Sequence, residues 1–96
     1  MKLHFRTEAL RLLETTDSKD FGQAVTERYR HRVNFIRNAT DERDFYAMKS
    51  LHFEKLVGNR AGQFSMRLND QWRLILTFQG EAPEKTVIIL EIADYH

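Results

Sequence analysis

The sequence predicts a single α+β domain, residues 1–96, with helices in the first half of the chain and a β-sheet in the second half. The spacing of the apolar residues carries this prediction. They recur every three or four positions before about Ser50 and every second position after it. The chain is 42% hydrophobic and 30% charged, which is typical of a globular domain rather than of a disordered segment.

The first half is predicted to contain a short strand followed by three helices. Residues 1–5 alternate and are expected to form an edge strand. Thr7 is a candidate N-cap for a first helix. A longer helix over residues 19–38 is predicted by apolar residues at helical spacing, namely Phe21, Val25, Tyr29, Val33 and Ile36. A short third helix is expected to begin at Thr40.

The second half is predicted to contain four strands separated by turns. Residues 51–56, 63–68 and 72–78 alternate along the chain, so that Ser65 is expected to point away from the helices. The last strand, residues 86–92, is β-branched and apolar on both faces. A strand of this kind belongs in the interior of a sheet rather than at its edge.

The turn at residues 69–71 decides which side chains share a face. A three-residue loop pairs Leu68 with Trp72 and Arg67 with Arg73, so that both apolar sets face the helices. A two-residue loop would turn one apolar set toward water. Two arginines are therefore expected side by side on the other face. Like charges directly opposite repel each other, and an anion site explains such a pair better than chance does.

The charge distribution is more informative than the net charge, which is only +1. Between Lys49 and Gln79 there are five cationic side chains and two acidic ones. Patches of this kind favour phosphates even at low net charge. A second cluster of cations, for which a solvated helix face is the simpler interpretation, consists of Arg28, Arg30, Arg32 and Arg37.

Several classes of protein and site are disfavoured. The chain has no cysteine, which leaves no disulfide or thiolate metal site and suits a reducing cytoplasm, where we expect the protein. The four histidines form no metal-binding motif, and no phosphate-cradling glycine motif is present. We therefore expect no metal and no cofactor. No apolar run is long enough to span a membrane, and the N-terminus does not resemble a signal peptide.

One set of polar residues fits cleavage of RNA without a metal. RNA carries its own nucleophile, the 2′-OH, so cleavage needs a base, an acid for the leaving 5′ oxygen, and cations for the developing charge. Histidine titrates near neutrality and can act as the base or as the acid. A tyrosine supplies an acid, or a ring that stacks on an RNA base. The candidates are His52, Arg67, Arg73, Asp94 and either Tyr95 or His96. Taken singly, His52 and Tyr95 are more often structural residues.

The stretch LHFEKLVGNRAGQFSMRLNDQWRLILTF, residues 51–78, together with the final DYH, resembles the HigB branch of the RelE/ParE superfamily. These proteins are toxins of bacterial type II toxin–antitoxin modules. The resemblance implies a RelE-like fold with two to three N-terminal helices on one face of a small, mainly antiparallel sheet. It also implies a ribosome-dependent mRNA endoribonuclease that cleaves A-site mRNA on the 70S ribosome, with contacts to 16S rRNA. The implied products are a 2′,3′-cyclic phosphate and a 5′-OH.

The resemblance further implies a HigA-like helix-turn-helix antitoxin as the partner, and contact with DNA only through that antitoxin. By position, it assigns catalytic roles to His52, Asp94, Tyr95 and His96, and roles in binding RNA phosphates to Lys55, Arg60, Arg67 and Arg73. The chain departs from the family in one place. It reads LHFEKLVGNR where the family commonly has LHPLKGDR, with two extra residues before the arginine. The orientation of His52 and the equivalence of Lys55 therefore stay open.

Two other functions share this fold, so that the fold alone does not decide between them. One is a ParE-like binding toxin that poisons DNA gyrase without cutting RNA. The other is an inert toxin retained as an antitoxin-binding co-repressor. The strand histidine and the final Asp-Tyr-His favour cleavage, because a binding protein does not need them. Nearly all the polar residues that cleavage needs are present, which argues against an inert co-repressor.

Overall fold

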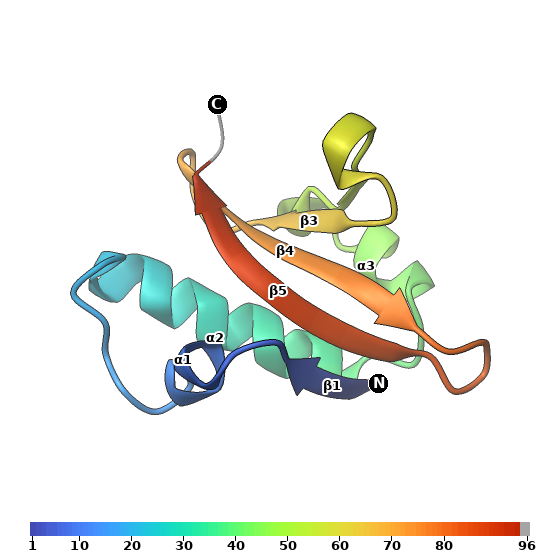
Figure 1. The fold of residues 1–96 in the computed structure, drawn as a ribbon, viewed down its shortest axis with the longest axis horizontal. Helices are drawn as coiled ribbons and strands as arrows, with labels where there is room; N and C mark the ends of the chain where they lie inside the picture. Colours follow the sequence, from blue (N-terminus) through green and yellow to red (C-terminus); the bar gives the residue numbers. More distant parts are fainter. Residues whose placement is uncertain (95–96) are drawn as a thin grey trace.

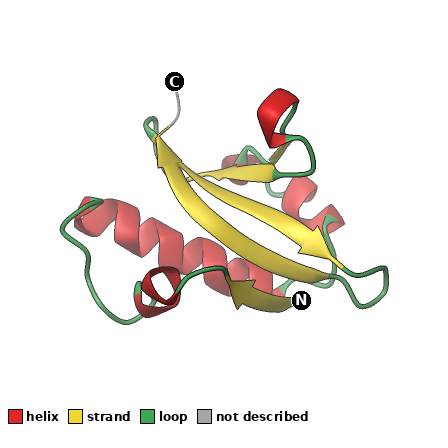
Figure 2. Cartoon of the chain, in the orientation of Figure 1, coloured by secondary structure: helices red, strands yellow, loops and turns green. Residues whose placement is uncertain are grey.

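A computed structural model describes residues 1–94 of the chain as a five-stranded sheet with helices on one face (Figures 1 and 2). The strands lie in the order β1-β5-β4-β3-β2, and β1 runs parallel to β5 while the other neighbours are antiparallel. They are β1 (Lys2–Phe5), β2 (Glu54–Lys55), β3 (Phe64–Arg67), β4 (Trp72–Gln79) and β5 (Thr86–Asp94). The predicted α+β class is confirmed, as are the edge position of the first strand and the interior position of the last.

Three helices contribute to one core with the inward-facing side chains of the sheet. They are α1 (Glu8–Leu12), α2 (Gly22–Asn38) and α3 (Arg43–Ala47). The N-cap predicted for the first helix is confirmed, because the Thr7 hydroxyl accepts a hydrogen bond from the Leu10 amide at 3.2 Å. Within the described range, no helix is both long and apolar enough to cross a membrane.

Helix α2 is anchored on α1 and on the residues that follow it by polar contacts as well as by apolar packing. The fully buried Tyr29 donates a hydrogen bond to the Leu10 carbonyl at 2.7 Å, and burial raises the pKa of its hydroxyl well above the usual value. Near the other end of α2, Arg37 pairs with Glu14 and lowers the pKa of that carboxyl. These contacts hold α2 against α1 and the loop after it.

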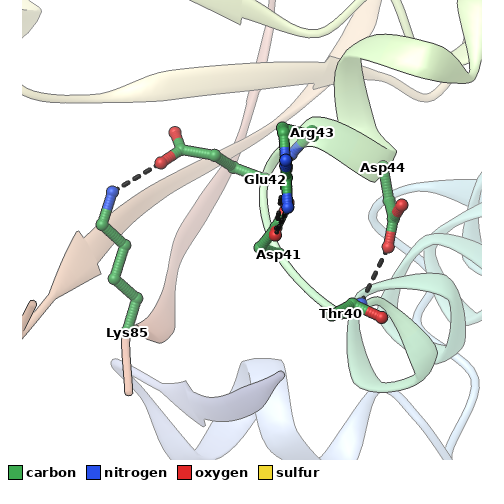
Figure 3. Close-up of polar contacts among 6 residues, drawn as sticks. All are labelled: Thr40, Asp41, Glu42, Arg43, Asp44 and Lys85. Atoms are coloured by element: carbon green, nitrogen blue, oxygen red, sulfur yellow. Dashed lines mark hydrogen bonds and ion pairs between the residues drawn. The ribbon is translucent and has the colours of Figure 1, made fainter. Parts of the chain in front are cut away.

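The third helix begins at Arg43, three residues later than expected from Thr40. Asp44 accepts a hydrogen bond from the Thr40 amide at 2.8 Å, and Asp41 accepts one from the Arg43 amide at 2.9 Å (Figure 3). Side chains that bond to nearby backbone amides favour a turn over a continued helix. Glu42 pairs with Lys85, which ties this turn to the start of β5.

The strand predicted over residues 51–56 is wrong except at Glu54–Lys55. A single 3₁₀ turn, η1 (Lys49–Leu51), is followed by His52 in the left-handed region, and only Glu54–Lys55 pair as β2. Leu51 and Phe53 are both buried and His52 between them is exposed, so the alternation is real. A tight turn produces it here, because Leu51 and Phe53 reach the core from the two sides of that turn.

The face of the sheet opposite α2 is partly covered by residues 56–63, which include the 3₁₀ helix η2 (Gly58–Arg60) (Figure 1). The Thr77 hydroxyl donates to the Gly62 carbonyl at 2.8 Å, and Arg60 pairs with Glu91 at 3.3 Å. Ser65 lies on this face as expected, yet it is buried, and its hydroxyl has no partner among the described residues. The centre of this face is therefore shielded from solvent.

Candidate functional site

A polar groove of about 310 Å³ brings two of the predicted residues together, His52 and Arg67. It lies where helix α2, the turn after η1, and the end of β3 meet. The lining residues are Arg28, Ser50, His52, Arg67, Leu68, Asn69 and Asp70. Three segments that are distant in the sequence therefore contribute side chains to one groove, in which cationic groups predominate.

His52 is held by its backbone rather than by its ring. Its φ and ψ angles are 46° and 49°, a left-handed conformation that costs a residue other than glycine roughly 1–2 kcal/mol. Its amide donates to the Lys49 carbonyl at 3.1 Å, and its own carbonyl accepts from the Arg73 guanidinium at 3.3 Å. These two contacts fix the turn, and the exposed imidazole projects from it.

The predicted register of the β3–β4 hairpin is confirmed. Arg67 lies opposite Arg73, and the Leu68 amide bonds to the Trp72 carbonyl at 2.9 Å. The two guanidinium groups diverge from this shared position. Arg67 forms an ion pair with the exposed Asp70 of the turn, whereas Arg73 is buried and bonds to the backbone of His52. One arginine therefore faces the groove, and the other supports the histidine.

Arg32 is a structural part of this site that the sequence interpretation missed. It is buried, and its guanidinium donates to the Arg67 carbonyl at 3.2 Å and to the Ser50 carbonyl at 3.3 Å. Burial lowers its pKa, and repulsion from Arg28 and Arg67 adds to that effect. The solvated-face interpretation is therefore wrong for Arg32. Its position could have been inferred from spacing, because it falls on the apolar stripe three residues after Tyr29.

We expect Arg32→Met to lower the free energy of unfolding by about 1–2 kcal/mol, because the carbonyls of Ser50 and Arg67 lose their donor. Urea unfolding followed by circular dichroism measures this change. Arg28→Met is the matched control, since Arg28 is exposed on the same helix. Equal stability of the two variants would contradict a structural role for the buried guanidinium.

The remaining predicted residues lie outside the groove. Arg60 pairs with Glu91 and bonds to Gln63 on the covered face of the sheet. Lys55 is exposed on β2. Asp94 lies opposite Trp72 in the β4–β5 register, which places its side chain on the helix side of the sheet, away from Arg73. Its carboxylate accepts from Gln71 at 3.2 Å. Tyr95 and His96, also predicted, are outside the described residues.

A register shift between β4 and β5 determines the position of Asp94. Ile75 pairs with Glu91 and Leu76 with Ile89, so that Leu90 is an extra residue on β5. Ala93, not Asp94, therefore lies opposite Arg73. Among residues 1–94, no group of three or more histidines and carboxylates is placed to hold a metal ion.

The fold is that of the RelE/ParE toxins. A solved structure, the YoeB/ParE toxin from Agrobacterium tumefaciens, superposes with a TM-score of 0.64 over 100% of both chains at 19% sequence identity. No curated protein sequence matches the chain. The sequence profile of the RelE-like toxins of the type II toxin–antitoxin system HigB matches residues 3–96, and the chain belongs to this family. It is therefore the toxin of a toxin–antitoxin module, with an antitoxin as its partner.

Proposed function

We propose that this toxin is a metal-independent endoribonuclease that cuts mRNA in the A site of the ribosome. The observation that carries the proposal is the exposed imidazole of His52 in a groove shared with the guanidinium groups of Arg28 and Arg67. A proton-transfer group beside cations is what 2′-OH attack on a phosphodiester requires. The buried Arg73 supports the assignment by fixing the backbone of His52.

In the proposed reaction, the 2′ oxygen bonds to phosphorus and the bond from phosphorus to the 5′ oxygen breaks. The products are a 2′,3′-cyclic phosphate and a 5′-OH. His52 exchanges one of the two protons, either by taking it from the 2′-OH or by giving it to the leaving oxygen. The second proton-transfer group is assigned to Tyr95 or His96, because the Asp94 carboxylate lies outside the groove and accepts a hydrogen bond from Gln71. Arg67 stabilises the charge that develops on the phosphorane.

The ribosome is proposed to supply the alignment that so small a groove lacks. Holding the 2′-OH, phosphorus and leaving oxygen in line accounts for a large share of the rate of such reactions. Lys55, which is exposed on β2, is assigned to contacts with the phosphates of 16S rRNA. Arg60 joins it only if an RNA phosphate displaces Glu91, its present partner.

The proposal is tested with purified toxin added to 70S ribosomes that hold a defined codon in the A site. Primer extension is expected to show a new mRNA end in that codon, and the 3′ fragment is expected to carry a 5′-OH. Intact mRNA under conditions in which an active RelE-type toxin cuts it would reject the proposal. Gyrase-linked DNA breaks in cells with intact mRNA would favour a gyrase-binding toxin instead.

The partner is proposed to be a HigA-like antitoxin with a helix-turn-helix domain, through which alone the toxin contacts DNA. The family membership establishes that an antitoxin exists, and the type of antitoxin is our inference. Co-expression with the product of the adjacent small reading frame is expected to abolish growth arrest. Growth arrest that persists would exclude that product as the antitoxin.

A further inference from the structure

Arg28 is the one lining residue of the groove that comes from helix α2. It is exposed, and among residues 1–94 its guanidinium has neither a hydrogen bond nor an ion pair. Other arginines of the same helix are engaged: Arg30 bonds to Asp17 and the Leu13 carbonyl, and Arg37 pairs with Glu14. An unpaired guanidinium at the wall of a groove is available to a ligand.

The charges around the groove favour an anion there. Asp70 is the sole carboxylate in its lining, and it is engaged with Arg67. Beneath the groove, the buried Arg32 bonds to backbone carbonyls, so its positive charge has no acidic partner in the described part of the chain. Burial lowers the pKa of Arg32, and repulsion from Arg28 and Arg67, which share the groove above it, lowers it further. A bound phosphate would relieve this repulsion.

The walls of the groove are rigid on both sides. The side-chain oxygen of Asn69 accepts from the amides of Gln71 and Trp72 at 2.8 and 2.7 Å, which fixes the β3–β4 turn. Arg32 joins α2 to the backbone of Ser50 and of Arg67. The backbones that carry Arg28 and Arg67 are therefore held in place by these bonds, and two cations on fixed supports suit a ligand with repeated negative charges.

We infer that Arg28 binds a backbone phosphate of the substrate mRNA. This phosphate is distinct from the scissile phosphate, which Arg67 binds. Helix α2 thereby forms a substrate-binding wall of the site. The inference rests on the proposed nuclease function for the identity of the substrate. The group that Arg28 would recognise is a phosphodiester, and 16S rRNA carries the same group. The experiment must therefore distinguish binding to mRNA from binding to rRNA.

The test measures how the affinity of the full chain for a short single-stranded RNA depends on salt, by fluorescence anisotropy. Loss of one phosphate contact is expected to reduce the slope of log K against log salt by about 0.7. We expect Arg28→Gln to show this loss together with a several-fold weaker affinity, and Arg28→Lys to retain most of the slope. Arg6→Gln is the matched control, because Arg6 is exposed and follows β1, at the opposite edge of the sheet.

An unchanged slope in Arg28→Gln, or no binding of wild-type protein to RNA at low salt, overturns the inference. A second arm measures binding to ribosomes without mRNA. If Arg28→Gln loses as much affinity there as with mRNA present, the phosphate belongs to rRNA, and the inference is also wrong. If RNA binding depends on Arg28 while wild-type toxin leaves A-site mRNA intact, the binding role stands and the proposed nuclease function fails.

Discussion

Replacement of His52 by asparagine is expected to reduce the rate of A-site cleavage by about 10²–10⁴-fold, the usual contribution of a general acid or base. Asparagine is the informative substitution, because it tolerates the left-handed conformation that His52 adopts at φ 46°. The ring is exposed, so its loss leaves the core unchanged. Cleavage is measured under single-turnover conditions on programmed ribosomes, and stability by urea unfolding.

Two further variants separate the lost ring from any effect on the turn. His52→Gly also removes the imidazole but relieves the left-handed strain, so it should be as inactive as His52→Asn and somewhat more stable. His4→Asn alters an exposed histidine on β1, at the other edge of the sheet, and should cleave at the wild-type rate. Cleavage by His52→Asn within a few-fold of wild type would remove His52 from the mechanism.

The parts of the fold that follow from burial were predictable from the sequence. Helix α2 shows its apolar stripe directly, and the hairpin register follows from the need to bury the residues of both strands on one side. The opposition of Arg67 and Arg73 is a consequence of that register, and the structure confirms it. Side chains alternate between the two faces of a strand, so a shift of one residue in strand pairing would expose a whole apolar face. The sequence therefore constrains the register strongly.

The parts that depend on backbone geometry were not predictable in this way. Leu51 and Phe53 are buried on either side of His52, as in a strand, although a left-handed turn joins them. The extra residue at Leu90 is hidden because β5 is apolar on both faces, and alternation there cannot reveal a shifted register. Arg32 is a similar case. Its charge predicts an exposed side chain, whereas its position on the apolar stripe of α2 predicts a buried one, and the side chain is buried.

Arg67 and Asp70 provide a pair of substitutions with opposite expected effects. Arg67→Gln should reduce the cleavage rate by about 10²–10³-fold, since a donor to the developing phosphorane charge is lost. Asp70→Asn should instead strengthen RNA binding, because it removes the one carboxylate that lines the groove and frees the Arg67 guanidinium. Neither change should unfold the protein: Asp70 is exposed, and Arg32 still holds the Arg67 carbonyl.

The two variants are compared in rate and in affinity for single-stranded RNA. Arg43→Gln is the control, since Arg43 also pairs with an acidic neighbour, Asp41, but lies on α3 outside the groove. If the ion pair with Asp70 were the only role of Arg67, both substitutions would break it equally and would have the same effect. Opposite effects would instead show that Asp70 competes with RNA for the Arg67 guanidinium, and that binding of substrate begins by displacing this carboxylate.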